Sequence, residues 1–364
     1  MKNKIKIAMV AVDLSRTGIS TVIMNYCSNI DLNKYKVDLI VGNRITPEYR
    51  EQCDSLNIRI IELPFKLDDA KGYFIGLFKT LSSKKYDIVH VHGNSAMIAP
   101  ELVIAWLKGI KVRIAHSHNT TCEHIKVEKL LRPIFNIFYT QGFACSKKAG
   151  QWLFGSNSFY VIPNGFKTEK FRFSNSKRNE IRKLLNIENK IVIGHIGQFN
   201  EQKNHEYLLD IFKHIGDKCE NAVLLLVGNG PDKEKICELI DKHSYKDRII
   251  VYGETDHPEE LYCAMDRFVF PSKYEGLGIV LLEAQINGLA CVASDVVPNE
   301  AVISSNVTCL SLDVSPRIWA DKVLTKNEIN RDRYYYDNLE NIRKYDIGIN
   351  AKFLMKLYSE FVKK

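Results

Sequence analysis

Short runs of β-branched and other apolar residues recur along the whole chain, and amphipathic segments separate many of them. The runs form two series: residues 5–12, 37–41, 58–61, 88–91, 112–115, 143–145 and 160–162, then residues 191–196, 222–227, 249–252, 267–270 and 291–293. The amphipathic segments with helical spacing include residues 20–30, 72–81, 206–215 and 232–243. Strands that alternate with helices form parallel sheets with helices on both faces. The sequence therefore predicts an α/β protein with two doubly wound, Rossmann-like domains.

Chain length and turn residues place the domain boundaries. A chain of 364 residues is too long for one ordinary hydrophobic core. Pro163, Asn164 and Gly165 interrupt the pattern after the first series, and a charge-rich segment follows. We expect one domain at residues 1–165 and a second at residues 166–340. Residues 341–364 are predicted to form a final helix that packs back on the first domain.

Composition indicates a soluble cytoplasmic protein. Hydrophobic residues make up 45% and charged residues 26% of the chain, which is typical of globular proteins. No apolar run is long enough to cross a bilayer, and the first residues resemble a strand rather than a signal peptide. The nine cysteines form no C-x-x-C pair, which favours reduced thiols and argues against a cysteine metal cluster.

Positive charge is concentrated in the first half of the chain. Residues 1–165 contain 22 Lys and Arg against 13 Asp and Glu, a balance of +9, whereas the remainder contains 29 against 30. Such a half is suited to an anionic partner, either a membrane surface or a pyrophosphate-linked acceptor. The alternative is a solvated basic surface without a partner. Nucleic acid is not expected, because the basic residues form no arginine-rich or aromatic-interleaved runs.

The segment from Ser272 to Glu283 concentrates the features of a ligand site. Glu275 lies on a glycine-rich turn, and Glu283 lies eight residues later. On a helix, eight residues return to nearly the same face, ~12 Å along the axis. Two carboxylates at this spacing are suited to two ends of an extended polar ligand. Phosphate would be bound by the backbone N–H groups at the start of the helix, those of Gly278, Ile279, Val280 and Leu281.

Loops that follow other predicted strands carry further candidate residues. Gly197 ends a strand and is followed by Gln198 and by Lys203, which we expect at the start of the next helix, where a lysine would neutralise phosphate. Gly228 ends the next strand, and Gly18 lies in the first strand-to-helix loop. Plain turns and a solvated lysine are the alternatives. The chain lacks G-x-G-x-x-G and the P-loop motif at these places, which argues against a dehydrogenase and a P-loop kinase.

Two histidine pairs end strands of the first series, His90 with His92 and His116 with His118. Ligands bind beyond the carboxyl ends of parallel strands, and residues i and i+2 share a face. Each pair is therefore predicted to line a cleft wall. A zinc site is the alternative, but no carboxylate or cysteine completes either pair at ligand spacing, so no metal is expected.

The order of these motifs resembles that of family 4 retaining glycosyltransferases, which have the GT-B architecture of two Rossmann-like domains facing a central cleft. The resemblance covers nearly the whole chain and is carried chiefly by the E-x7-E segment. The matching segments are residues 197–204 (GQFNEQKN), 228–231 (GNGP) and 271–284 with Gly288, together with 116–120, 145–146, 161–165 and 312–320. The last four segments are similar to the bacterial exopolysaccharide and capsule branch.

The resemblance implies a function. A hexose would move from a nucleotide diphosphate sugar, expected to be a UDP-sugar, to a glycan acceptor, expected to be lipid-linked. Anomeric configuration would be retained, and no metal or other cofactor would be needed.

The resemblance also implies residue roles. Glu283 would hold the donor ribose and Glu275 the donor sugar, while Lys203 and the N–H groups at positions 278–281 would take the diphosphate. His118 would contact the transferring sugar or acceptor, and Gly18 would approach the phosphates.

Two departures from the family pattern stand out. Gln198 occupies a position where the family usually has Arg, so one cation on the diphosphate is missing. Thr17 and Ser20 replace a glycine and an acid in the first loop. The neutral Gln198 keeps one alternative open, a non-catalytic sugar-nucleotide-binding subunit that activates a partner transferase. A GT-B epimerase or phosphorylase lacks this E-x7-E context, and a solute-binding protein would need an export signal.

Residues 124–139 mix basic and large apolar side chains within the basic domain. Such a helix is suited to the surface of an anionic membrane, beside a lipid-linked acceptor, which would make the protein peripheral at the inner face of the cell membrane. The alternative is a helix with its apolar side facing the core and its lysines in solvent.

Overall fold

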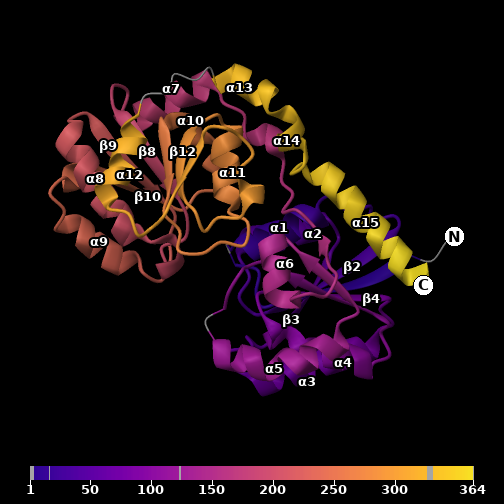
Figure 1. Ribbon diagram of the computed structural model, residues 1–364. Helices are drawn as coiled ribbons and strands as arrows, with labels where there is room; N and C mark the ends of the chain where they lie inside the picture. The colour runs from indigo at the N-terminus through magenta and orange to yellow at the C-terminus, as the bar shows by residue number, and fades with distance from the viewer. Residues whose placement is uncertain (1–3, 16, 123, 326–330, 364) are drawn as a thin grey trace. The chain divides into compact units, whose positions relative to one another are not determined.

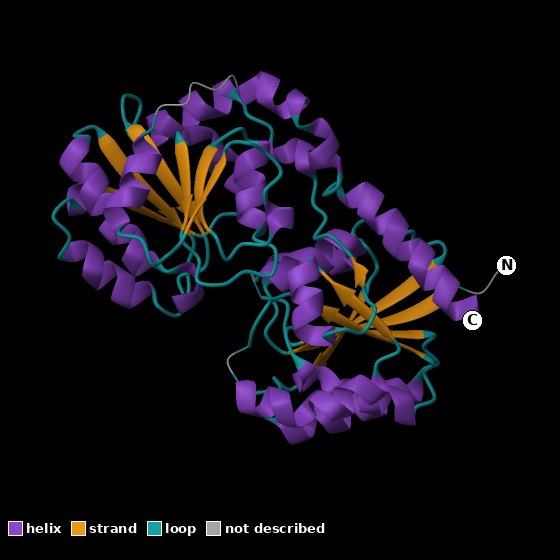
Figure 2. Cartoon of the chain, in the orientation of Figure 1, coloured by secondary structure: helices purple, strands orange, loops and turns teal. Residues whose placement is uncertain are grey.

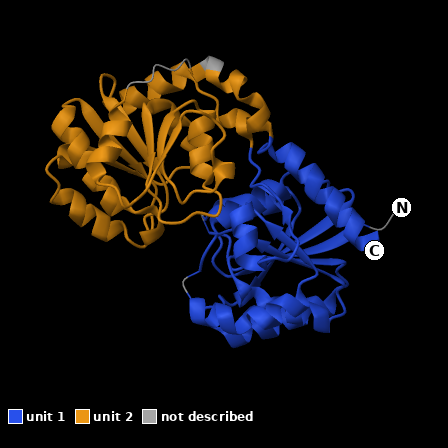
Figure 3. Cartoon of the chain, viewed as in Figure 1, with its two compact units in different colours: residues 1–166, 344–364 blue, residues 167–343 orange. Residues whose placement is uncertain are grey.

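The computed structural model describes residues 4–15, 17–122, 124–325 and 331–363, coloured along the chain in Figure 1. Strands alternate with helices through most of the chain (Figure 2). The chain forms two compact units, Met1–Phe166 with Lys344–Lys364, and Lys167–Arg343 (Figure 3). The expected boundaries after residues 165 and 340 lie close to these two crossing points.

The first unit contains a parallel sheet of seven strands. Their order is β3-β2-β1-β4-β5-β6-β7, and every adjacent pair is parallel. The strands are β1 (Ile5–Ala11), β2 (Tyr35–Gly42), β3 (Arg59–Leu63), β4 (Ile88–Gly93), β5 (Val112–Ser117), β6 (Gln141–Ala144) and β7 (Tyr160–Val161). The helices are α1 (Gly18–Cys27), α2 (Pro47–Ser55), α3 (Ala70–Ser83), α4 (Ala99–Leu107), α5 (Ile125–Phe138), α6 (Lys147–Phe154) and, from the end of the chain, α15 (Ile347–Lys363).

The second unit repeats the design with six parallel strands in the order β10-β9-β8-β11-β12-β13. The strands are β8 (Ile191–Ile196), β9 (Ala222–Val227), β10 (Ile249–Gly253), β11 (Arg267–Phe270), β12 (Ala290–Ser294) and β13 (Val307–Leu310). The helices are α7 (Asn175–Leu184), α8 (His205–Lys218), α9 (Lys233–Asp241), α10 (Pro258–Ala264), α11 (Ile279–Ile286), α12 (Pro316–Leu324), α13 (Arg331–Asp337) and α14 (Leu339–Arg343).

Both sheets have a point where the direction of chain winding reverses. It lies between β1 and β4 in the first unit and between β8 and β11 in the second. In doubly wound sheets, ligands bind beyond the carboxyl ends of the strands at this switch point. The loops after β8 and β11, and those after β1 and β4, are therefore where a site is expected on physical grounds.

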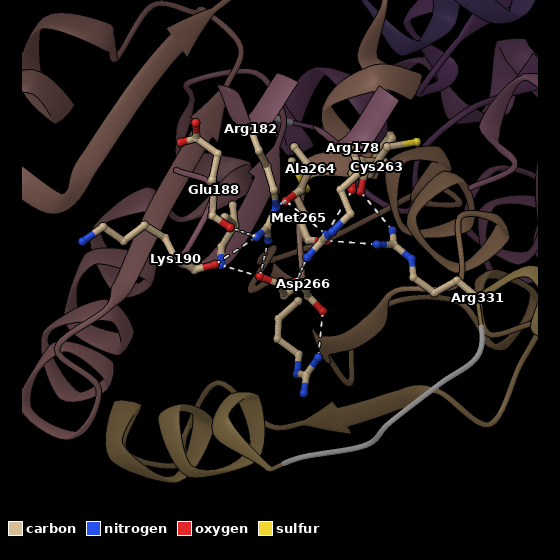
Figure 4. Close-up of polar contacts among 12 residues, drawn as sticks. Arg178, Arg182, Glu188, Lys190, Cys263, Ala264, Met265, Asp266 and Arg331 are labelled. Atoms are coloured by element: carbon tan, nitrogen blue, oxygen red, sulfur yellow. Dashed lines mark hydrogen bonds and ion pairs between the residues drawn. The ribbon is translucent and has the colours of Figure 1, made fainter. Parts of the chain in front are cut away.

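Arginines fix the end of α10 just before β11 begins (Figure 4). Arg178 and Arg182 of α7 each reach a different carboxylate oxygen of Asp266 at 2.5 Å. The same arginines donate to carbonyls of residues 263–265, and Arg331 of α13 adds bonds to Tyr262 and Met265. Cations suit a helix C-terminus, whose last carbonyls lack intrahelical partners. The cluster thus ties α7, α10 and α13 to the start of the strand that leads to Glu275.

Helix α15 belongs to the first unit and packs there. Its buried positions include Leu354, Leu357, Tyr358 and Phe361. The Tyr358 hydroxyl lies 2.7 Å from His90 Nδ1, and the Tyr35 hydroxyl donates to the Met355 carbonyl at 2.7 Å. The first of these polar contacts is buried and the second is partly buried, so they help to fix the orientation of the helix.

The predicted α/β architecture with two Rossmann-like sheets is confirmed, and each of the twelve predicted runs coincides with a strand of the structure. Sequence analysis missed β13, a half-exposed edge strand. Among the described residues, none of the helices combines the length and the apolar character that crossing a membrane requires.

Candidate active site

Two loops of the second unit are bound together at the switch point. The 3-10 turn Glu201–Lys203 follows β8, and the segment after β11 runs beside it. Gln202 is the main link, because its side chain donates to the Tyr274 carbonyl and its carbonyl accepts from the Lys273 N–H, both at 2.8 Å. Asn204, in the left-handed region at φ 58°, donates to the Pro271 carbonyl. The positions of Lys203 and Glu275 are therefore set by one bonded frame.

Lys203 and Glu275 form an ion pair in this frame. Lys203 Nζ lies 2.5 Å from Glu275 Oε1, and both side chains are largely buried. The Phe270 ring lies 4.8 Å below the ammonium group, a cation–π contact. We expected Lys203 at the start of a helix, but it ends the 3-10 turn, and α8 begins two residues later. A buried ammonium with one carboxylate partner is well suited to an added anion.

Helix α11 begins beside Glu275 with Gly278 at its N-cap. Gly278 has φ 83°, where a side chain would be strained. The first N–H groups of a helix lack intrahelical partners, and those of Ile279 and Val280 belong to this set. The N–H of Leu281 differs from the expectation, because it donates to the Gly278 carbonyl at 3.0 Å. Of the N–H groups predicted to bind phosphate, only those before Leu281 therefore stay candidates.

Glu283 lies one turn further along α11 and accepts a hydrogen bond from the Tyr262 hydroxyl at 2.9 Å. Although Glu283 keeps some solvent exposure, its carboxyl group is desolvated, and this raises its pKa to about 8. The hydrogen bond from Tyr262 lowers the pKa and the nearby Glu259 raises it, both less than desolvation does. Because this carboxyl group has lost water, hydroxyl groups of a ligand could replace water as its hydrogen-bond partners.

The glycines after β8 and β9 serve contacts within the chain. A Cβ on Gly228, whose φ is 139°, would lie 2.0 Å from the Gly197 carbonyl oxygen. A Cβ on Gly230 would lie 2.3 Å from the Phe199 carbonyl oxygen, and a Cβ on Gly197 would crowd the Lys203 stem. The GNGP segment is therefore explained by close packing of two loops. Gln198 is exposed there, with its side-chain oxygen accepting from Asn200 at 3.1 Å.

The four predicted histidines of the first unit form one buried stack. His92 pairs in register with His116 on the neighbouring strand, so the i, i+2 pairs of β4 and β5 share a face. The His90–His92 and His116–His118 rings are each stacked at 4.2 Å. His90 Nε2 lies 3.1 Å from His116 Nδ1, and His92 Nδ1 lies 2.9 Å from His118 Nε2.

Burial decides what the stack can do. His90, His92 and His116 are at most 4% exposed and His118 is 9% exposed, so the prediction that both pairs line a cleft wall is wrong for the first three. Desolvation lowers the pKa of His90 and of His118 to about 3, and those of His92 and His116 fall well below the usual value. His118 therefore acts at neutral pH as an uncharged hydrogen-bonding group.

Three of these imidazoles also meet the distance condition for metal ligation. Nitrogen atoms of His90, His92 and His116 lie within 4.8 Å of one another. Both nitrogens of His90 are hydrogen-bonded, to Tyr358 and to His116. A metal ion on His90 would have to displace one of these bonds. The metal-free function expected from the sequence stays a prediction.

In the loop after β1, the two residues that depart from the family pattern, Thr17 and Ser20, contact each other at the start of α1. Thr17 is the N-cap of α1, and its hydroxyl lies 3.0 Å from that of the buried Ser20. Gly18 follows at the first helical position, exposed, without a left-handed φ, and with no atom within 4 Å of where a Cβ would lie. Neither backbone conformation nor packing therefore requires glycine at this position.

Sequence reasoning missed the residues that support the site. The Tyr262 hydroxyl donates to Glu283. The Gln202 side chain joins the two loops, and the Asn200 side chain accepts from the Lys203 N–H. Tyr262 is 21 residues from Glu283 and comes from another helix. No local pattern connects the two, so only the fold reveals the contact.

Residues 176–334, which make up most of the second unit, match the family model for glycosyl transferases group 1. The second unit therefore contains a domain of this family, and the chain is a glycosyltransferase. The glycosyltransferase is 28% identical over 365 residues to EpsF of Bacillus subtilis (strain 168), covering 95% of this chain and 94% of EpsF. It is also 28% identical over 279 residues to the UDP-Gal:alpha-D-GlcNAc-diphosphoundecaprenol alpha-1,3-galactosyltransferase of Escherichia coli, covering 69% and 70% of the two chains.

The glycosyltransferase has the GT-B fold of its structural neighbours. The crystal structure of Anabaena Alr3699/HepE in complex with UDP and glucose superposes with a TM-score of 0.82. The alignment covers 98% of this chain and 99% of that one, at 15% identity. At this identity the likeness concerns the fold.

Proposed function

We propose that this glycosyltransferase moves a hexose from a UDP-sugar to a lipid-linked glycan acceptor in the synthesis of a bacterial exopolysaccharide or capsule, with retention of anomeric configuration. The observation that carries the proposal is the Lys203–Glu275 ion pair beside the first N–H groups of α11, at the switch point of the second sheet. UDP is bound in the HepE crystal structure, and the Escherichia coli relative is named for a UDP-Gal donor and a diphosphoundecaprenol-linked acceptor.

The proposed reaction breaks the bond between the anomeric carbon and the donor diphosphate. The acceptor hydroxyl oxygen forms the new bond to that carbon, and its proton leaves with the diphosphate or to solvent. Negative charge therefore grows on the diphosphate. Lys203 and the N–H groups of Ile279 and Val280 would stabilise it without a divalent cation, because oriented dipoles and a desolvated cation are effective in such a site.

Each remaining residue has a role in this proposal. Glu275 would accept hydrogen bonds from the donor sugar, and Glu283 would accept them from the ribose. When phosphate approaches Lys203, the ammonium would share its N–H donors between phosphate and Glu275, which would free part of the carboxylate for the sugar. Gly18 and His118 keep their predicted roles toward phosphates and toward the transferring sugar.

Direct transfer assays test the proposal. We would first screen UDP-sugars by thermal shift, since a ligand at a hundredfold its Kd adds ~2.7 kcal/mol of stability. Transfer from the best donor to a synthetic polyprenyl-diphosphate glycan would then be followed by mass spectrometry, and the anomeric configuration by NMR. Full activity after treatment with EDTA is expected. Loss of activity that added magnesium restores would overturn metal independence.

Substitution of Glu275 gives the sharpest result. Glu275→Gln should lower kcat by about a hundredfold or more, because a neutral amide neither balances Lys203 nor accepts as strongly from the sugar. Glu180→Gln is the matched control, since the Glu180 side chain is exposed on α7 in a surface ion pair with Lys177. Wild-type turnover by the Glu275 variant would refute the site.

The non-catalytic alternative rests on Gln198, the exposed neutral residue at the family's Arg position. It predicts that purified protein binds UDP-sugars but neither transfers nor hydrolyses them. The same assay therefore decides between the two functions.

A further inference from the structure

Helix α5 presents its apolar side to solvent rather than to the core. Only Glu128 and Phe135 are buried in it. The exposed positions include Val127, Leu130, Ile134 and Ile137, whose spacing of three, four and three residues forms one stripe along the helix. Leu130 is 76% and Ile137 is 70% exposed. The alternative of a core-facing apolar side with solvated lysines is therefore wrong.

The stripe is part of a larger apolar surface on α3, α4 and α5, which form one layer on one face of the first sheet (Figure 1). Of the 18 large hydrophobic residues exposed in the described chain, nine lie on these three helices. They are Ile75, Phe78, Trp106, Leu107, Ile125, Val127, Leu130, Ile134 and Ile137. The three helices together contain 37 residues. Half of the exposed large hydrophobic residues thus lie on a small part of the chain, which indicates an interaction surface rather than scattered exposure.

Aromatic contacts connect the three helices across this surface. Trp106, which is 51% exposed, packs edge-on against Phe138 of α5 with ring centroids 5.1 Å apart. Lys108 Nζ lies 3.0 Å from the centroid of the Phe78 ring of α3. A tryptophan and a lysine beside exposed aliphatic residues are typical of surfaces that lie at the boundary between headgroups and acyl chains.

Within α3, α4 and α5 the exposed charges are all basic: Lys71, Lys79, Lys126 and Lys129. Lys111, after α4, is exposed as well, and the exposed Asp68 and Asp69 lie just before α3. The two acidic residues within the three helices are buried and paired, Glu101 with Lys66 and Glu128 with Arg132. Apolar side chains ringed by lysines match an anionic bilayer in both respects, because the lysines attract the headgroups and the apolar groups enter the interface.

We propose that the outer surface of α3, α4 and α5 is a membrane-docking surface that binds the face of an anionic lipid bilayer. This deepens the proposed function by placing the enzyme where a lipid-linked acceptor lies. Binding to lipid needs no donor and no turnover, so its failure and the failure of the transferase proposal are read in separate assays.

Co-sedimentation of the full chain with vesicles tests this docking. Vesicles with about 30% phosphatidylglycerol in phosphatidylcholine should bind the protein at low salt, and pure phosphatidylcholine vesicles should bind it about tenfold less. Leu130→Ser with Ile137→Ser should weaken binding about tenfold or more, and Lys126→Glu with Lys129→Glu should do the same. The matched control is Leu184→Ser with Ile318→Ser, which removes two exposed side chains, 65% and 46% exposed, from the second unit.

Trp106 provides a second readout. Of the three tryptophans, Trp319 is fully buried, and Trp152 is half-buried with its indole N–H donating to the Asn94 carbonyl. A blue shift of tryptophan emission on adding anionic vesicles should therefore come mainly from the exposed Trp106 and disappear in Trp106→Phe. Equal binding to neutral and anionic vesicles, or unchanged binding of the Leu130 and Ile137 double variant, would overturn the proposal. So would a protein that ignores vesicles but forms a dimer that this double variant dissociates, because the surface would then be a contact between copies.

Discussion

Single residues in this enzyme fall into those that the fold requires and those that it does not. Gly228, Gly230 and Gly278 are fixed by close backbone contacts or by a left-handed conformation. Gly18 has neither constraint. Under the proposed function, Gly18 would serve a phosphate that approaches the start of α1.

The substitution Gly18→Ala distinguishes a glycine that the fold requires from one that ligand binding requires. Because Gly18 is helical and has free space around it, alanine should leave stability unchanged or raise it by up to about 1 kcal/mol. If a ligand approaches this backbone, the added methyl group should lower kcat/KM by about tenfold or more. Thermal unfolding and donor kinetics on the same preparation check both. Unaltered kinetics would remove Gly18 from the site.

Glu283 gives a stability prediction with a definite sign. Its folded pKa of about 8 is raised above the ordinary carboxyl value, so the folded state keeps a proton that the unfolded state has lost between about pH 4.5 and pH 8. The stability of the wild type should therefore fall as pH rises through this window. Glu283→Gln should be more stable than wild type at pH 8 by at most a few kcal/mol, after allowing for its partial exposure, and similar at pH 4.5.

Thermal unfolding of both proteins between pH 4.5 and pH 9 makes this measurement. A constant difference in Tm at every pH would show that Glu283 is ionised throughout. Nucleotide binding provides an independent check, because hydroxyl groups that donate to an ionised Glu283 should cause proton release when UDP binds near pH 7.

At the scale of elements, local pattern located the buried strands and three of the four edge strands, β3, β7 and β10, but it missed the edge strand β13. Buried parallel strands are continuous apolar runs, as in β9, so sequence alone located them. The edge strand β13 has one side in solvent and lacks such a run. Pattern located the His90 and His116 pairs at strand ends but not their stacking, because stacking depends on the register between β4 and β5.

Helix α5 shows the converse limit. Its sequence is amphipathic, and an amphipathic helix usually turns its apolar side to the core. Here Glu128 faces inward with Arg132, and the backbone N–H of Ala96 donates to its carboxylate. Composition could not reveal which side was buried, because that depends on the neighbouring segments.

The contact between α15 and β4 gives an element-scale prediction. Tyr358→Phe removes the hydroxyl that is 2.7 Å from the buried His90 Nδ1 while keeping the ring. The unpaired nitrogen should lower stability by about 1–3 kcal/mol. Denaturant unfolding measures the change, with Tyr336→Phe as control, since Tyr336 is 57% exposed. Equal losses in the two variants would show that the Tyr358 hydroxyl contributes nothing specific.

For the whole molecule, buried neutral histidines should make the protein sensitive to acid. Desolvation lowers the pKa of His195 to about 4 and of His205 to about 2, in addition to the four-histidine stack. The unfolded chain binds protons at these sites near pH 6.5, whereas the folded chain does not. Stability should therefore fall as pH drops below 6.5, with each histidine contributing up to ~1.4 kcal/mol per pH unit.

Calorimetry at constant ionic strength between pH 5 and pH 7.5 tests this dependence. His205→Phe should reduce the slope by about one proton, whereas His257→Gln should not, because His257 is exposed. A Tm that stays constant over this range would mean that folding does not lower the pKa of these histidines.

Because residues 344–364 belong to the first unit, the ribosome makes the whole second unit before the first can be finished. At 5–20 residues per second, the nascent first half waits on the order of ten to forty seconds for its last helix. During that interval the surface of the first unit that Leu354 and Leu357 cover is exposed to solvent, and His90 lacks its hydrogen-bond partner, the Tyr358 hydroxyl. Nascent chains stalled shortly before residue 344 should therefore recruit chaperones far more strongly than released ones.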